Sequence, residues 1–108
     1  MSVFTVLNPA TGEPVTTVAQ ASAEEADEAI VRAAAAQATW RDVAPGDRAR
    51  LLRAFAAAVD AHVEELADLE VAGSGHPVGQ ARWEAGQVRD VLLYYSAAQN
   101  GCAASRSR

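Results

Sequence analysis

PGDRARLLRAFAAAVDAHVEELADLEVAGSGHP, residues 45–77, is the stretch around which the rest of the chain is organised. Its larger apolar residues recur every three or four positions, which places them on one face of an α-helix. The spacing predicts a single helix over about 46–72, beginning near Pro45 and ending before the loop Gly73 to Pro77. A helix with one apolar face needs other surfaces to cover that face. The apolar positions are Leu52, Phe55, Val59, Val63, Leu66 and Leu69.

Upstream of this helix, two short segments rich in β-branched residues, Val3 to Leu7 and Val15 to Val18, flank the turn sequence Asn8 to Glu13. Asn, Pro and Gly are the residues that tight turns require, so the pattern predicts a β-hairpin over residues 3–18. Pro14 cannot donate to a strand ladder and favours an edge position. A lone hairpin is marginal in water, so it must lie against another element.

Two further helices are predicted. Ser22 and Glu25 have the spacing of a capping box, which places the start of a helix over about 23–39. Apolar residues from Val78 to Tyr95 repeat at helical spacing and predict a helix over about 78–98. The expected fold class is α+β, mostly α: a hairpin followed by three helices within residues 1–98. Residues 99–108 lose the apolar spacing and are expected to be disordered.

The composition limits the core and the partners. Of the 108 residues, 26 are alanine and 6% are aromatic, so any core is modest in area. The net charge is −5 and the pI about 4.9, which excludes the electrostatic footprint of a nucleic-acid-binding protein. Cys102 alone cannot form an internal disulfide, which favours a cytoplasmic location. With no long apolar run and no signal peptide, no membrane association is expected.

No catalytic, cofactor-binding or metal-binding residue is assigned. His62 and His76 have no second ligand at a metal-binding sequence spacing and are interpreted as ordinary surface or loop histidines. Gly73 to Gly75 follows a helix rather than a strand, so we interpret it as a helix C-terminus with left-handed glycines. Cys102 lies in the predicted tail without a positioned base. The acidic run is interpreted as a solvated face; it comprises Glu64, Glu65, Asp68 and Glu70.

Five segments in succession resemble the N-terminal region of NAD(P)-dependent aldehyde dehydrogenases, across residues 3–98. Each segment is a weak signal alone, and their order and spacing carry the resemblance. The segments are Asn8-Pro9-Ala10-Thr11-Gly12-Glu13, the helix through Ala33 to Trp40-Arg41, Pro45-Gly46-Asp47-Arg48-Ala49, Leu69-Glu70 to Gly75-His76-Pro77, and Tyr94-Tyr95.

The resemblance implies a family that oxidises aldehydes to carboxylic acids with NAD or NADP. The family uses a cysteine nucleophile, a glutamate base, an oxyanion-hole asparagine and a Rossmann-type cofactor domain, and none of those motifs is in this sequence. The loop also departs from the family, which usually has Lys at the position of His76. We therefore expect an inactive N-terminal fragment that binds no cofactor itself and is part of a larger α/β fold.

Two further hypotheses concern the C-terminal tail and an alternative function. The tail after Gln99 departs from the family pattern, and translation of plausible codons in another frame resembles the family continuation; a truncating frameshift, in the gene or in its sequencing, would explain this. The alternative function is an autonomous small helical module that self-associates or binds a partner protein through the apolar face of residues 45–77.

Overall fold

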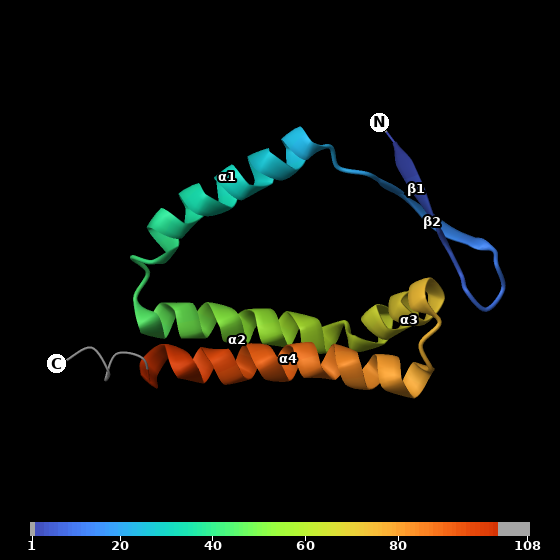
Figure 1. Cartoon of the computed structure of the whole chain (residues 1–108). Helices are drawn as coiled ribbons and strands as arrows, with labels where there is room; N and C mark the ends of the chain where they lie inside the picture. Colours follow the sequence, from blue (N-terminus) through green and yellow to red (C-terminus); the bar gives the residue numbers. More distant parts are fainter. Residues whose placement is uncertain (1, 102–108) are drawn as a thin grey trace.

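The computed structural model describes residues 2–101, with side chains described as far as residue 98. Within that part of the chain, a two-stranded hairpin precedes four helices (Figure 1). The fold class expected from the sequence, a hairpin followed by a mostly helical chain, is confirmed. The elements are β1 (Val3–Leu7), β2 (Pro14–Ala19), α1 (Ala23–Trp40), α2 (Pro45–Ala61), α3 (Val63–Ser74) and α4 (Val78–Gly101).

The hairpin pairs β1 and β2 antiparallel, with Val3 opposite Ala19 and Leu7 opposite Pro14. The backbone amide of Asn8 donates to the Glu13 carbonyl at 2.9 Å, and the Asn8 side chain accepts from the Ala10 amide at 2.9 Å. Gly12 has a φ of 73°, a conformation that glycine adopts without a steric penalty. The turn chemistry predicted from the sequence therefore closes this hairpin.

Helix α1 begins at the predicted capping box. The Ser22 hydroxyl accepts from the Glu25 amide at 3.1 Å, and the Glu25 carboxylate accepts from the Ser22 amide at 2.8 Å. All 18 residues of α1 are nevertheless exposed. Local capping, rather than tertiary packing, thus specifies where this helix begins.

The prediction of a single helix over 46–72 is wrong in one respect: two helices, α2 and α3, meet at His62. The His62 amide donates to Val59, three residues back, at 3.0 Å, instead of to Ala58. The His62 ring donates from Nδ1 to the vacated Ala58 carbonyl at 2.8 Å. A side chain that replaces a backbone donor can interrupt a helix without any Pro or Gly. The spacing of the apolar residues does not reveal such a break.

The third predicted helix, 78–98, is confirmed and continues three residues further, to Gly101, into the segment predicted to be disordered. Residues 102–108 of the predicted tail lie outside the described residues. Gly86 lies in the interior of α4, and a Cβ there would meet only the end of the Arg89 side chain, at 4.0 Å. Helix α4 is thus the longest helix of the described chain, and it tolerates a glycine in its interior.

Helices α2 and α3 both pack against α4, with α2 running antiparallel beside it (Figure 1). The seam consists of small side chains, which allow two helix backbones to approach closely. β1 contacts α3, so the hairpin is attached at the α3 end of the helices. The buried residues are Ala49, Ala56, Val59, Ala67, Ala81, Ala85 and Ser96.

Most of the larger apolar residues of the opening stretch do not enter this seam. Val59 is buried, but Phe55 is 58% exposed and Leu69 is 61% exposed. The radius of gyration is 18.5 Å, whereas a compact domain of this length has a value of about 13 Å. The chain exposes 8119 Å², and a compact monomer of its mass exposes about 5,700 Å². The fold is therefore open, with helices that share a thin alanine seam and carry uncovered apolar surface.

Candidate functional site

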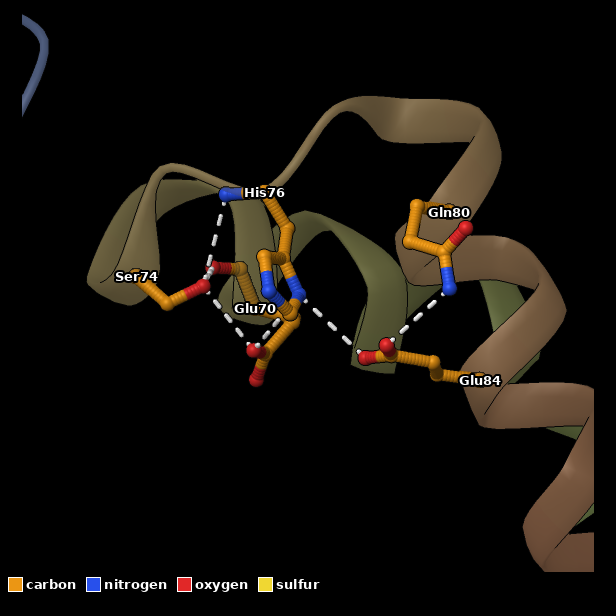
Figure 2. Close-up of polar contacts among 5 residues, drawn as sticks. All are labelled: Glu70, Ser74, His76, Gln80 and Glu84. Atoms are coloured by element: carbon orange, nitrogen blue, oxygen red, sulfur yellow. Dashed lines mark hydrogen bonds and ion pairs between the residues drawn. The ribbon is translucent and has the colours of Figure 1, made fainter.

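The loop between α3 and α4 brings three ionisable side chains together (Figure 2). Glu70 belongs to the last turns of α3, His76 to the loop, and Glu84 to the second turn of α4. His76 Nδ1 lies 3.2 Å from Glu70 Oε1 and 3.2 Å from Glu84 Oε2. Their side chains are 42%, 45% and 40% exposed for His76, Glu70 and Glu84 respectively. Within residues 2–101, this cluster is the one group of three or more His, Cys, Asp or Glu side chains whose ligand atoms lie close enough to hold a metal ion.

The local backbone places the loop. Gly75 follows α3 in the left-handed conformation, with a φ of 77°, and its amide donates to the Val71 carbonyl at 3.0 Å. A Cβ on Gly75 would lie 2.7 Å from Pro9 Cγ of the hairpin turn. Gly75 is therefore the left-handed helix end that the sequence predicted. Gly73 is not a second one, because it lies inside α3.

The carboxylates of the cluster are held by neighbouring polar groups. The Ser74 hydroxyl lies 2.9 Å from Glu70 Oε1 and 2.8 Å from the Glu70 carbonyl oxygen, so one proton is shared between two acceptors. Gln80 donates from Nε2 to Glu84 Oε1 at 3.2 Å. The His76 amide lies 3.4 Å from Ser74 Oγ. These contacts fix both carboxylates beside the imidazole.

Sequence reasoning missed this cluster because its ligands lie at irregular spacings. Glu70 lies six residues before His76 and Glu84 eight residues after it, across a helix end, a turn and a helix start. Only the reversal of the chain at Gly75 brings them together. The one available signal was a histidine in a turn that follows an acidic helix.

One member of the acidic run, Glu64, is paired with an arginine of α4. Arg82 Nε lies 2.8 Å and 3.1 Å from the two Glu64 oxygens. Arg89 contacts Asp60 at 2.7 Å and Asp90 at 2.8 Å. The hydrogen bonds that Arg89 donates, to Asp90 first and Asp60 second, raise the pKa of its guanidinium, so it stays charged. These exposed pairs contribute little to stability, because solvent screens them.

The other residues considered as candidates from the sequence do not join this cluster. His62 serves the helix break described above, and Cys102 lies outside the described residues. The Tyr94 and Tyr95 rings meet edge to face at 5.3 Å and are 71% and 56% exposed. Within residues 2–101, no helix combines the length and apolarity that a bilayer span requires. Outside the cluster, the main chemical feature of the described surface is therefore its uncovered apolar side chains.

A groove of about 220 Å³ runs between α3 and α4 beside the cluster. Glu70 and Glu84 form its polar end, and the rest of its lining is apolar. The groove is shallow and open, without the enclosing walls of a substrate pocket. The apolar lining residues are Leu66, Ala81, Ala85 and Val88.

Comparison with known proteins places this fold. The sequence profile of the aldehyde dehydrogenase family matches residues 1–106. Betaine aldehyde dehydrogenase of Cereibacter sphaeroides is 37% identical over 94 residues, which cover 84% of this chain and 19% of the relative. Malonate-semialdehyde dehydrogenase 1 of Geobacillus kaustophilus is 40% identical over 79 residues, which cover 73% of this chain and 16% of the relative.

Solved structures agree. A Burkholderia cenocepacia protein assigned to the aldehyde dehydrogenases matches with a TM-score of 0.85 and 31% identity, over 90% of this chain and 21% of that one. Betaine aldehyde dehydrogenase of Staphylococcus aureus, solved in complex with NAD+, matches with a TM-score of 0.83 and 25% identity, over 90% and 20%. The chain spans about a fifth of the length of these proteins. It belongs to the aldehyde dehydrogenase family and corresponds to the N-terminal region of that family's members.

Proposed function

We propose that this chain is a structural segment of an NAD(P)-dependent aldehyde dehydrogenase and supplies scaffold rather than reacting groups. The parent reaction is the oxidation of an aldehyde to a carboxylic acid, with hydride transfer to NAD or NADP. Support comes from the family match and from the likeness to a Staphylococcus aureus enzyme solved with NAD+. We place the reaction in the cytoplasm, on the grounds of the single cysteine.

The observation that carries this proposal is the uncovered apolar surface. Phe55, Leu69 and Trp83 are 58%, 61% and 59% exposed. Side chains of this size contribute roughly 1.5–3 kcal/mol each when fully buried. A segment that matches a fifth of its relatives and leaves such residues exposed fits a part whose covering surface belongs to the rest of the enzyme.

The chain alone is then expected to bind no cofactor and to turn over no aldehyde. A phosphate cradle needs a glycine-rich turn between a strand and a helix, whereas Gly73 and Gly75 lie at the end of one helix, before another. Nucleophilic catalysis by a thiol needs a base and an oxyanion hole held around it. Residues 23–101, which make up the four helices, contain no cysteine that could be held in this way.

The experiment is a direct assay of the purified chain. NAD and NADP reduction is followed with betaine aldehyde and with a simple aliphatic aldehyde, beside a full-length betaine aldehyde dehydrogenase as positive control. We expect no turnover by the chain and strong binding of an apolar fluorescent dye. Aldehyde-dependent reduction of either cofactor by pure chain would contradict the scaffold role.

The second candidate function is an autonomous helical module that self-associates or binds a protein through the same exposed face. The alanine seam between α2 and α4 favours it, since the two helices have an interface of their own. Sedimentation and thermal melting discriminate the two. A cooperatively melting monomer or defined dimer without dye binding supports the module, and concentration-dependent association with dye binding supports the segment.

A further inference from the structure

The Glu70, His76 and Glu84 cluster has an electrostatic peculiarity. His76 Nδ1 is fully buried as an atom and, among the described residues, has no aligned hydrogen-bond partner, although two carboxylate oxygens lie 3.2 Å away. Figure 2 shows one carboxylate on each side of this nitrogen. A ring nitrogen without a proton would be repelled by both oxygens. A positive centre between the three atoms removes that conflict.

The distances suit a metal ion at that position. Zinc bonds to histidine nitrogen at about 2.0–2.1 Å and to carboxylate oxygen at about 2.0–2.2 Å, so neighbouring ligand atoms of a tetrahedral site lie about 3.3–3.5 Å apart. The two N···O separations of 3.2 Å are close to that ligand–ligand separation, and all three ligand atoms lie within 4.8 Å of one another. A hydrogen bond needs one oxygen in line with the N–H bond, whereas a metal ion needs the oxygens to flank that line.

A second layer of contacts orients the ligands. The Ser74 hydroxyl contacts Glu70, and the Gln80 amide contacts Glu84, each through a hydrogen bond to a carboxylate oxygen. Such outer contacts hold metal ligands in position, and their loss typically weakens metal binding 10- to 100-fold. The nearby cation Arg82 is paired with Glu64 and does not neutralise the cluster. Two carboxylates and a neutral imidazole match the charge of a divalent ion.

We propose that Glu70, His76 and Glu84 form a three-ligand site for a first-row divalent transition-metal ion, with water completing the coordination. Imidazole favours zinc, iron, nickel or copper over Mg²⁺ and Ca²⁺, which prefer all-oxygen sites. The ligands come from α3, the loop and α4, so the ion clamps the chain reversal at Gly75. This site is independent of the scaffold role proposed above.

The test is calorimetric titration of the 108-residue chain with ZnCl₂. All variants carry Cys102→Ser, which removes the one thiol that could bind zinc elsewhere. We expect one Zn²⁺ per chain and slower amide hydrogen exchange around Gly75, which a chelator reverses. His76→Ala should weaken binding at least 100-fold, and Ser74→Ala about 10-fold. His62→Ala is the matched control, since its ring bonds a backbone carbonyl, and should bind zinc like the parent.

Glu84→Gln provides a second variant in case His76→Ala perturbs the loop. It keeps the side-chain size and should weaken zinc binding by at least 10-fold, while far-UV circular dichroism without metal stays unchanged. Co²⁺ in place of Zn²⁺ should give the intense visible absorption of a four-coordinate site in the parent and not in His76→Ala. Absence of stoichiometric binding, equal zinc affinity of His76→Ala and His62→Ala, or equal stabilisation by Mg²⁺ would each overturn the site.

Discussion

Helices α1 and α2 are both rich in alanine, yet they differ completely in burial. Ala49 and Ala56 of α2 are each 1% exposed, whereas every residue of α1 is exposed. The difference lies in the neighbours: α4 packs along α2, whereas within residues 2–101 no helix packs in that way against α1. An alanine face is a helix-forming signal everywhere and becomes a core only where a second small-residue face lies against it.

The largest expected effect comes from breaking that seam. Ala56→Leu inserts three carbon atoms where two backbones approach, and overpacking of this kind costs about 1–3 kcal/mol. We expect the slowest-exchanging amides of α2 and α4 to lose protection by that amount in native-state hydrogen exchange. Ala34→Leu in α1 is the matched control, and it should change protection by less than about 0.5 kcal/mol. Equal effects of the two variants would mean that the seam contributes no more than α1 does.

An intermediate effect is expected where the hairpin meets the helices. Gly75→Ala places a Cβ in a left-handed residue, at a cost of about 1–2 kcal/mol, and within 2.7 Å of Pro9 Cγ. We expect faster exchange in α3 and in the hairpin, with α1 unchanged. Gly86→Ala is the control, and its expected effect on stability has the opposite sign. Its Cβ has room, and the substitution should stabilise α4 by about 0.5–1 kcal/mol. Destabilisation by Gly86→Ala would show that α4 has a closer neighbour there.

The smallest effect concerns the unpacked helix. The backbone amide of Glu24, and then the Ser22 hydroxyl, lower the pKa of the Glu24 carboxyl below its ordinary value of 4.5. Because the folded-state pKa is lowered, this carboxylate stabilises the start of α1 above the unfolded pKa. That contribution is lost as the pH falls from about 4.5 through the folded value. A carboxyl NMR titration should give a midpoint below 4.5 for Glu24.

Ser22→Ala is the control for that titration. It removes the second cause of the shift and should move the Glu24 midpoint part of the way back towards 4.5. The accompanying loss of amide protection should stay within the first turns of α1, because this helix buries nothing in the described structure. A loss that spread to α4 would mean that α1 is coupled to the helix pair, and the contrast drawn above would fail.

Much of this fold follows from local chemistry. The Asn8 turn, the Ser22 capping box and the Gly75 helix end were all predicted, because each depends on a few adjacent residues. The His62 break was not predicted, because it depends on which donor reaches the Ala58 carbonyl. The burial of the opening stretch was not predicted either: the large residues Phe55 and Leu69 remain exposed, and alanines fill the seam.

The candidate site was also predicted only in part. The sequence supplied His76 and the acidic run before it, and the assignment of no catalytic or metal residues stays a prediction. Only the chain reversal brought Glu70 and Glu84 within 3.2 Å of one imidazole nitrogen. Residues six and eight positions away, across a helix end and a turn, have no fixed separation in sequence patterns.

By itself, the sequence determined the elements, their order and the family, because backbone propensities, caps and turns act over a few residues and the family pattern is linear. The tertiary structure decided which face of residues 45–77 is covered and which side chains meet at its end. Burial and side-chain convergence depend on the position of a second helix, which no local interaction fixes. In this chain that helix is α4, beside which α2 buries Ala49, Ala56 and Val59 and leaves Phe55 exposed.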